Sequence, residues 1–109
     1  MLRIYRTSLE VAGALAPFIE KVGRRNPDLA RQMTRAMTSV PLNISEGNHS
    51  RGKNRAARWH DAMGSAREVV SCIEVASAMR FARIDGLESV IDGLDRIVAT
   101  LWILIHGKR

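Results

Sequence analysis

Residues 27–46 read PDLARQMTRAMTSVPLNISE, and this stretch decides which fold the sequence predicts. Its apolar residues recur at spacings of three and four, which places them on one face of an α-helix; they are Leu29, Met33, Ala36, Val40 and Ile44. Asn26 is a favourable N-cap and Pro27 a favourable first helical residue. Because the pattern continues past Pro41, we expect one helix from Pro27 to Glu46, bent at that proline.

Three more helices are predicted on either side of this stretch, and strand-like alternation is absent. Their expected ranges are Thr7 to Val22, Asn54 to Ala82 and Gly86 to His106. The breaks are Gly23, the segment Gly47 to Lys53, and a turn in which Asp85 and Glu88 resemble a capping box. Long helices with short connections favour antiparallel neighbours. The sequence therefore predicts an all-α protein, an up-down antiparallel four-helix bundle that forms a single domain over residues 1–109.

Apolar rows on the other helices predict the core, and two helices have more apolar surface than a bundle needs. The expected core rows are Leu9, Ala12, Ala16 and Ile19; Trp59, Met63, Ala66, Val70 and Ile73; and Leu87, Val90, Leu94, Ile97, Leu101 and Leu104. Second rows are Val11, Leu15, Phe18 and Val22, and then Ile91, Val98, Trp102 and Ile105. A lone bundle would expose such rows, so we expect a homo-oligomer with Ile91, Val98, Trp102 and Ile105 at its interface. A broader core face is the alternative.

The net charge of +6 is concentrated in one part of the chain. Between Lys21 and Arg58 there are nine basic and only two acidic residues. Such an excess indicates an anionic partner, of which nucleic acid is the commonest, although a merely solubilising surface is the alternative. The candidate contacts to RNA are Arg24, Arg25, Arg31, Arg51, Lys53, Arg55 and Arg58. The sequence leaves open whether they form one stripe or two separate ends.

Four of these candidates open the third helix, where basic residues are a poor choice for helix stability. The first turn of a helix has free backbone N–H groups and the positive end of the helix dipole, so it favours anions. Binding therefore explains Arg51, Lys53, Arg55 and Arg58 better than folding does.

Polar residues of the second helix form a stripe beside its apolar face: Gln32, Arg35, Ser39, Asn43 and Glu46. With no histidine, no cysteine and one carboxylate, this stripe is weak as catalytic machinery. We interpret it as a structural hydrogen-bond network, with a solvated face as the alternative. The protein is not expected to be an enzyme.

The remaining chemistry-bearing residues predict neither a metal site nor a cofactor. Glu46, His49, His60 and Asp61 match no ligand spacing, and the single Cys72 is interpreted as a buried structural thiol. No signal peptide is recognisable, and the longest apolar run is about half the roughly 20 residues of a membrane span. We therefore expect a soluble, cytoplasmic protein that does not bind membranes.

Two motifs resemble a known family. Residues 32–47 read QMTRAMTSVPLNISEG and residues 64–68 read GSARE. Together they resemble the four helix bundle protein family found inside intervening sequences of large-subunit ribosomal RNA genes, which is related to accessory proteins of diversity-generating retroelements. The first helix differs because it has no tryptophan, the first connection is shorter, and Ala82 stands where the family usually closes the third helix with glycine.

The resemblance implies a ring-like homopentamer with a basic surface, and some family members associate with a reverse transcriptase and its template RNA. It implies no catalytic residues. We expect a non-enzymatic RNA-binding protein that contacts phosphates with little sequence specificity. The alternative is a protein-interaction scaffold that docks a partner such as a reverse transcriptase.

Overall fold

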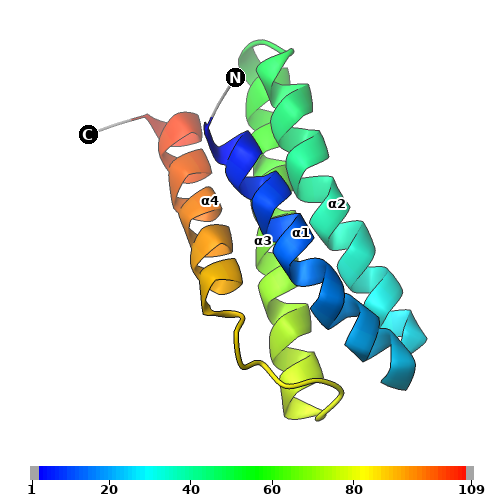
Figure 1. The fold of residues 1–109 in the computed structure, drawn as a ribbon. Helices are drawn as coiled ribbons and strands as arrows, with labels where there is room; N and C mark the ends of the chain where they lie inside the picture. The colour runs from blue at the N-terminus through cyan, green and yellow to red at the C-terminus, as the bar shows by residue number, and fades with distance from the viewer. Residues whose placement is uncertain (1–2, 108–109) are drawn as a thin grey trace.

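The structure is a computed structural model that describes residues 3–107, and it is an all-α bundle of four helices. The helices are α1 (Arg3–Arg25), α2 (Pro27–Asn48), α3 (Gly52–Ala78) and α4 (Glu88–His106). Successive helices run in opposite directions (Figure 1). Each packs against two others, α1 on α2 and α4, and α3 on α2 and α4. The described residues contain no strand, so the predicted fold class and the up-down order are confirmed.

The first connection is tighter than the sequence suggested. α1 does not end near Gly23 but continues to Arg25, and it begins at Arg3 rather than Thr7. Asn26 is the N-cap of α2, because its side-chain Oδ1 accepts a hydrogen bond of 3.0 Å from the backbone N–H of Leu29. One residue therefore separates the two helices.

The end of α3 and the start of α4 differ most from the prediction. α3 ends at Ala78, four residues before the predicted Ala82. Arg80 takes the left-handed φ of 62°, and the backbone N–H of Phe81 donates to the carbonyl of Ala76. These are the features of a Schellman cap, with arginine at the position where glycine is usual. The third helix thus closes with a left-handed residue, two positions before Ala82.

The predicted capping box at the start of α4 is wrong. The N-cap of α4 is Leu87, and no side chain caps the helix. Asp85 instead forms an ion pair with Arg83 at 2.7 Å within the connection. The carboxylate is therefore held by a neighbouring guanidinium rather than by the helix N-terminus.

The core contains the predicted rows of α2, α3 and α4 but the other row of α1. Buried α1 residues include Val11, Leu15, Phe18 and Val22, whereas Leu9 is 48% exposed. The expectation for this helix was wrong because both of its rows are apolar, and only its packing against α2 and α4 determines which one is covered. On α4 the predicted row is buried from Leu87 to Leu101, but Leu104 is exposed.

Two glycines allow neighbouring elements to approach closely. A Cβ on Gly47 would lie 2.3 Å from Nε1 of Trp59, and a Cβ on Gly93 would lie 2.7 Å from a methyl group of Val11. Atoms do not approach this closely, so these two contacts, α2 on α3 and α1 on α4, need glycine at these positions. In the part of the chain that the structure describes, no helix has the length and apolar character to cross a membrane.

Candidate nucleic-acid interface

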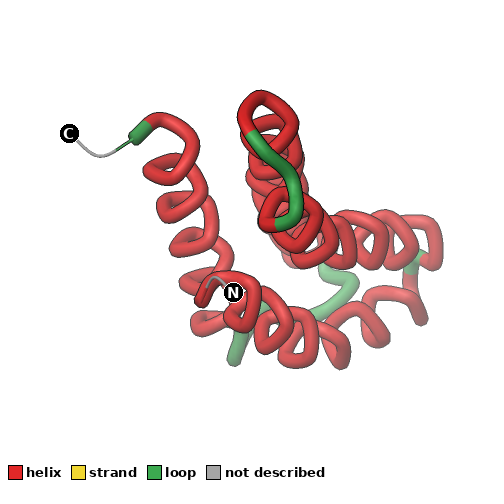
Figure 2. Tube along the Cα trace, turned by 90° about the horizontal axis from the view of Figure 1, so that it is seen from above, coloured by secondary structure: helices red, strands yellow, loops and turns green. Residues whose placement is uncertain are grey.

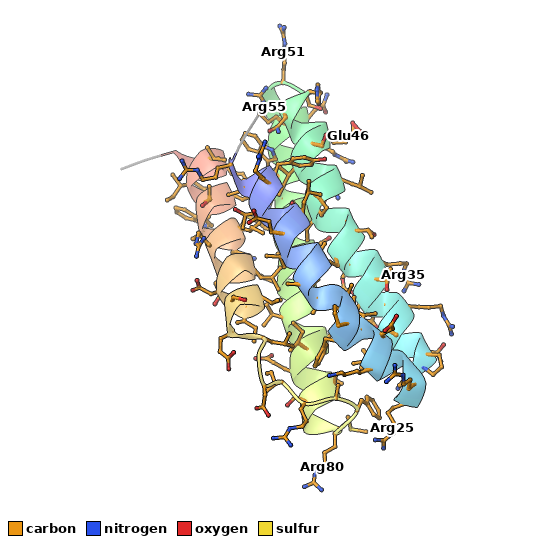
Figure 3. All side chains as sticks on the ribbon, viewed as in Figure 1. Arg25, Arg35, Glu46, Arg51, Arg55 and Arg80 are labelled. Carbon is orange, nitrogen blue, oxygen red and sulfur yellow. The ribbon has the colours of Figure 1, made fainter. Side chains whose placement is uncertain are left out.

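The seven candidate contacts to RNA lie at two separate ends of the bundle, which answers the question that the sequence left open. The start of α1, the α2–α3 connection and the end of α4 share one end, and the other two connections share the opposite end (Figure 1). Figure 3 shows Arg51 and Arg55 at the first end and Arg25 and Arg80 at the second. The molecule measures 42 × 24 × 20 Å, so the two ends are separated along its longest dimension.

We name the first end the tip and the second end the foot, by their basic residues. The tip comprises Arg3, Arg6, Arg51, Lys53, Arg55 and Arg58. The foot comprises Lys21, Arg24, Arg25, Arg31, Arg80 and Arg83. Arg3, Arg6, Lys21, Arg80 and Arg83 were not among the predicted contacts. The up-down order of the helices, which places the start of α1 beside the second connection, was the signal that could have included the first two.

The middle of the bundle, which we name the waist, has the opposite charge balance. Its basic residues are Arg35, Arg67 and Arg96, and its acidic residues are Glu10, Glu68, Asp92 and Asp95. A groove of about 290 Å³ between α1 and α4 is lined partly by Glu10, Asp92 and Arg96. Arg96 pairs with Asp92 at 2.8 Å, so the carboxylate of Glu10 is the charge left without an ion pair among the described residues that line the groove. Carboxylates repel phosphate, so this groove is unsuited to the nucleic-acid backbone.

Arg51 and Lys53 are the tip residues best placed to bind an anion. Arg51 is the N-cap residue of α3 and makes no side-chain capping bond. Both side chains are exposed, and neither forms an ion pair among the residues described. Gly52 between them takes a left-handed φ of 55°, which glycine adopts without strain. Two unpaired cations thus lie at the positive end of the α3 dipole.

Arg55 has a structural role at the tip. Its Nε donates a hydrogen bond of 3.0 Å to the carbonyl of Gly47, and its guanidinium lies 5.5 Å from the ring centre of Trp59. Its Nη2 donates a longer bond of 3.4 Å to the carbonyl of Asn48. Gly47 and Asn48 are the last residues of α2, where a cation is favourable. Arg55 therefore closes the α2–α3 hairpin, while Arg58 lies 3.5 Å from the exposed carboxylate of Asp61.

Trp59 is the residue around which the tip packs. The indole is 7% exposed and lies against Gly47, with Arg55 over one face. Its Nε1 is buried and has no hydrogen-bond partner among the described residues. The indole therefore holds the two helix ends together by packing, at the cost of one unsatisfied donor.

The foot is organised around the close of α3. Arg25 donates a hydrogen bond of 3.3 Å from Nη1 to the carbonyl of Arg80, and its guanidinium lies 6.0 Å from the ring centre of Phe81. Arg31 pairs with Asp28, and Arg83 pairs with Asp85. Arg24 and Arg80 have exposed side chains with no ion pair in the described part of the chain.

The polar stripe of α2 lies along its contact with α3. Nδ2 of Asn43 donates to Oγ of Ser39 at 2.9 Å, and Oγ of Ser65 on α3 donates to the same oxygen at 2.8 Å. Farther along, Nε2 of Gln32 lies 3.4 Å from a carboxylate oxygen of Glu68. The motif residues of the two helices thus meet each other across the hairpin. Arg35 and Glu46, the other two members of the stripe, are exposed.

Of the four residues expected at an oligomer interface, one is well exposed. Ile91, Val98 and Ile105 are half-buried against the core of their own chain. Trp102 is 45% exposed, and its ring centre lies 4.3 Å from that of His106. The exposed Ile103 and Leu104 belong to the same last turns of α4. Seen from above, this end of α4 is separated from the α2–α3 connection (Figure 2).

The described residues contain no group of three or more side chains that could hold a metal ion. Cys72 is buried in the core, where burial and, secondarily, the charge of Glu68 raise the pKa of its thiol. A protonated, enclosed thiol is a poor nucleophile.

Comparisons with known proteins place these features in context. A family model described as "23S rRNA-intervening sequence protein" matches residues 1–102. Among curated proteins, none matches the chain. A crystal structure of a protein of unknown function from the S23 ribosomal protein family of Bacteroides thetaiotaomicron superimposes with a TM-score of 0.84. It is 19% identical, and the alignment covers 95% of this chain and 99% of that one, so it shows a shared fold.

Proposed function

The chain belongs to the 23S rRNA-intervening sequence protein family, and on this premise we propose that it is a non-enzymatic protein that binds RNA phosphates through the tip. The observation that supports this proposal most strongly is the pair of exposed, unpaired cations Arg51 and Lys53 at the start of α3. Neither stabilises its own helix, because each lies at the positive end of the helix dipole.

The whole tip adds to this local effect. The tip has six basic residues but only two carboxylates, Glu46 and Asp61, among the described residues. A surface with this excess attracts phosphates over several ångströms and releases counterions when they bind, which gives affinity without reading the bases. The exposed rings near this end already have neighbours in the chain: Trp102 contacts His106, the ring of His60 lies 6.0 Å edge-on from that of His106, and Nδ1 of His49 lies 2.9 Å from the carbonyl oxygen of Ser45. We therefore expect weak sequence preference and strong dependence on salt.

The proposal includes self-association and a cytoplasmic role. Trp102, Ile103 and Leu104 expose apolar surface at the end of α4, and contact with a second copy would remove it from water. The homopentamer implied by the family resemblance would gather five basic tips in one particle. A protein partner such as a reverse transcriptase, covering the same residues, is the competing proposal.

Fluorescence anisotropy with labelled RNAs of unrelated sequence tests the RNA proposal. The double variant Arg51→Gln/Lys53→Gln should bind every RNA more weakly, by a similar factor of about tenfold, since phosphate contacts contain no sequence information. Arg35→Gln/Arg67→Gln removes the same charge from the waist and serves as the matched control. Equal loss in both variants would indicate diffuse attraction and contradict a site at the tip.

A further inference from the structure

The foot is a second concentration of positive charge, and it is organised rather than scattered. Arg24 and Arg25 end α1, and the side chain of Arg25 reaches the carbonyl of Arg80 at the close of α3. The end of α1 and the close of α3, which are distant in the sequence, therefore meet at one end of the bundle, and both have arginines there. Figure 3 shows Arg25 and Arg80 at the end opposite Arg51.

Arg80 occupies a position that folding alone would give to glycine. Its φ of 62° is in the left-handed region, which is unfavourable for a residue with a Cβ. The side chain is exposed and makes no hydrogen bond or ion pair among the described residues. No contact of the Arg80 side chain within the described part of the protein therefore offsets the unfavourable backbone conformation. A contact with another molecule would explain why arginine occupies this position.

The foot also has carboxylates, but two of them are already neutralised. Asp28 pairs with Arg31 and Asp85 pairs with Arg83, which leaves Glu20, Glu74 and Glu88. The basic residues of the foot that form no ion pair among the described residues are Lys21, Arg24, Arg25 and Arg80. The foot is consequently less basic than the tip, yet it has free cations to offer to a phosphate backbone.

The tip and the foot act independently of each other in electrostatic terms. The bundle is 42 Å long, whereas the screening length at physiological ionic strength is about 8 Å. The waist between them has four carboxylates and three arginines, so an RNA backbone lying along the helices would meet net negative charge. One continuous RNA track along the bundle is therefore disfavoured.

From this separation we infer that each protomer binds two RNA segments at once, one at the tip and one at the foot, and so bridges them. The inference rests on the proposed RNA-binding function and extends it from one contact to two. The recognised chemistry is the same at both ends, a run of backbone phosphates. The bundle acts as a spacer that holds the two segments about one bundle length apart.

A bead assay with two RNAs tests the inference. One RNA hairpin is attached to beads through biotin, a second hairpin of unrelated sequence is labelled with fluorescein, and the full-length protein is added at physiological salt. The wild type should retain the labelled hairpin on the beads. In the Trp102→Glu background, which should dissociate the oligomer and leave one tip per particle, Arg24→Gln/Arg80→Gln should lower that retention at least about fivefold while changing the affinity for a single hairpin by less than about threefold. The waist variant Arg35→Gln/Arg67→Gln should leave retention unchanged.

The outcomes separate the two proposals. If the wild type binds no hairpin at all, the RNA-binding proposal fails and this inference falls with it. If the wild type binds the attached hairpin but retains no second one, the inference alone is overturned. Undiminished bridging by the foot variant in the Trp102→Glu background would overturn it too, because the foot would then contribute nothing to the bridge. Circular dichroism of the foot variant checks its folding; glutamine replaces arginine at the left-handed position 80 at similar conformational cost.

Discussion

Replacing Gly47 by alanine tests the packing that shapes the tip. In the structure a Cβ at this position would lie 2.3 Å from Nε1 and 2.4 Å from Cδ1 of Trp59. Favourable contacts between carbon atoms are about 3.5 Å or longer, so the overlap exceeds about 1 Å. The indole is 7% exposed and has Arg55 over one face, which restricts its ability to move aside.

Two opposing effects set the size of the expected change. Overpacking of a filled core costs roughly 1–3 kcal/mol, and an overlap this large belongs at the upper end. Alanine in a helix gains about 1 kcal/mol over glycine. We therefore expect Gly47→Ala to lower the free energy of unfolding by about 2 kcal/mol. Gly13→Ala is the matched control, because a Cβ there meets nothing within 4 Å; it should raise the free energy by about 0.5–1 kcal/mol.

Urea unfolding followed by far-ultraviolet circular dichroism measures both variants. Protein concentration is held constant, since association would otherwise change the midpoint. The two substitutions are chemically identical, but they should change the free energy of unfolding in opposite directions, because only the Cβ at position 47 overlaps Trp59. If Gly47→Ala stabilised the protein as Gly13→Ala should, the indole would have room to move, and the description of the tip would be refuted.

Three further changes test other parts of the account. Arg55→Gln should lower the free energy of unfolding by about 1 kcal/mol, because the last carbonyls of α2 lose their donor; an unchanged urea midpoint would mean that this cap contributes nothing. Asn43→Ala should also cost about 1 kcal/mol through its lost bond to Ser39, whereas a loss below about 0.5 kcal/mol would indicate a solvated face. Analytical ultracentrifugation should show an oligomer that Trp102→Glu dissociates with its helices intact, and unfolding instead would place Trp102 in the core.

The sequence was sufficient to predict the fold where each helix had a single apolar row. α2 was predicted nearly to its ends because its row, its N-cap and its first proline all agree. α1 has two apolar rows of similar strength, and choosing between them requires knowing where α2 and α4 lie. The close of α3 at Arg80 was not predictable from propensity, because arginine rarely adopts a left-handed conformation.

The candidate site was only partly accessible from the sequence for a similar reason. The run of basic residues at the start of α3 was visible, and Arg51 and Lys53 have the exposed positions expected of a binding surface. Arg55 has a different role because it contacts the carbonyl of Gly47 across the hairpin, and only folding brings these two residues together. Arg58 pairs with Asp61 three residues farther along α3, a spacing that is visible in the sequence. Neighbours that a helix meets only after folding cannot be read from spacing along one helix.

The dependence of RNA affinity on salt tests the central claim, a phosphate-binding site at the tip, most directly. Affinity is measured for the wild type and for Arg51→Gln/Lys53→Gln over a series of salt concentrations, and its logarithm is plotted against the logarithm of the salt concentration. Each lost phosphate contact should flatten the slope by about one unit, so we expect a change of up to about two units. An identical slope for the two proteins would remove Arg51 and Lys53 from the binding surface and contradict the proposal.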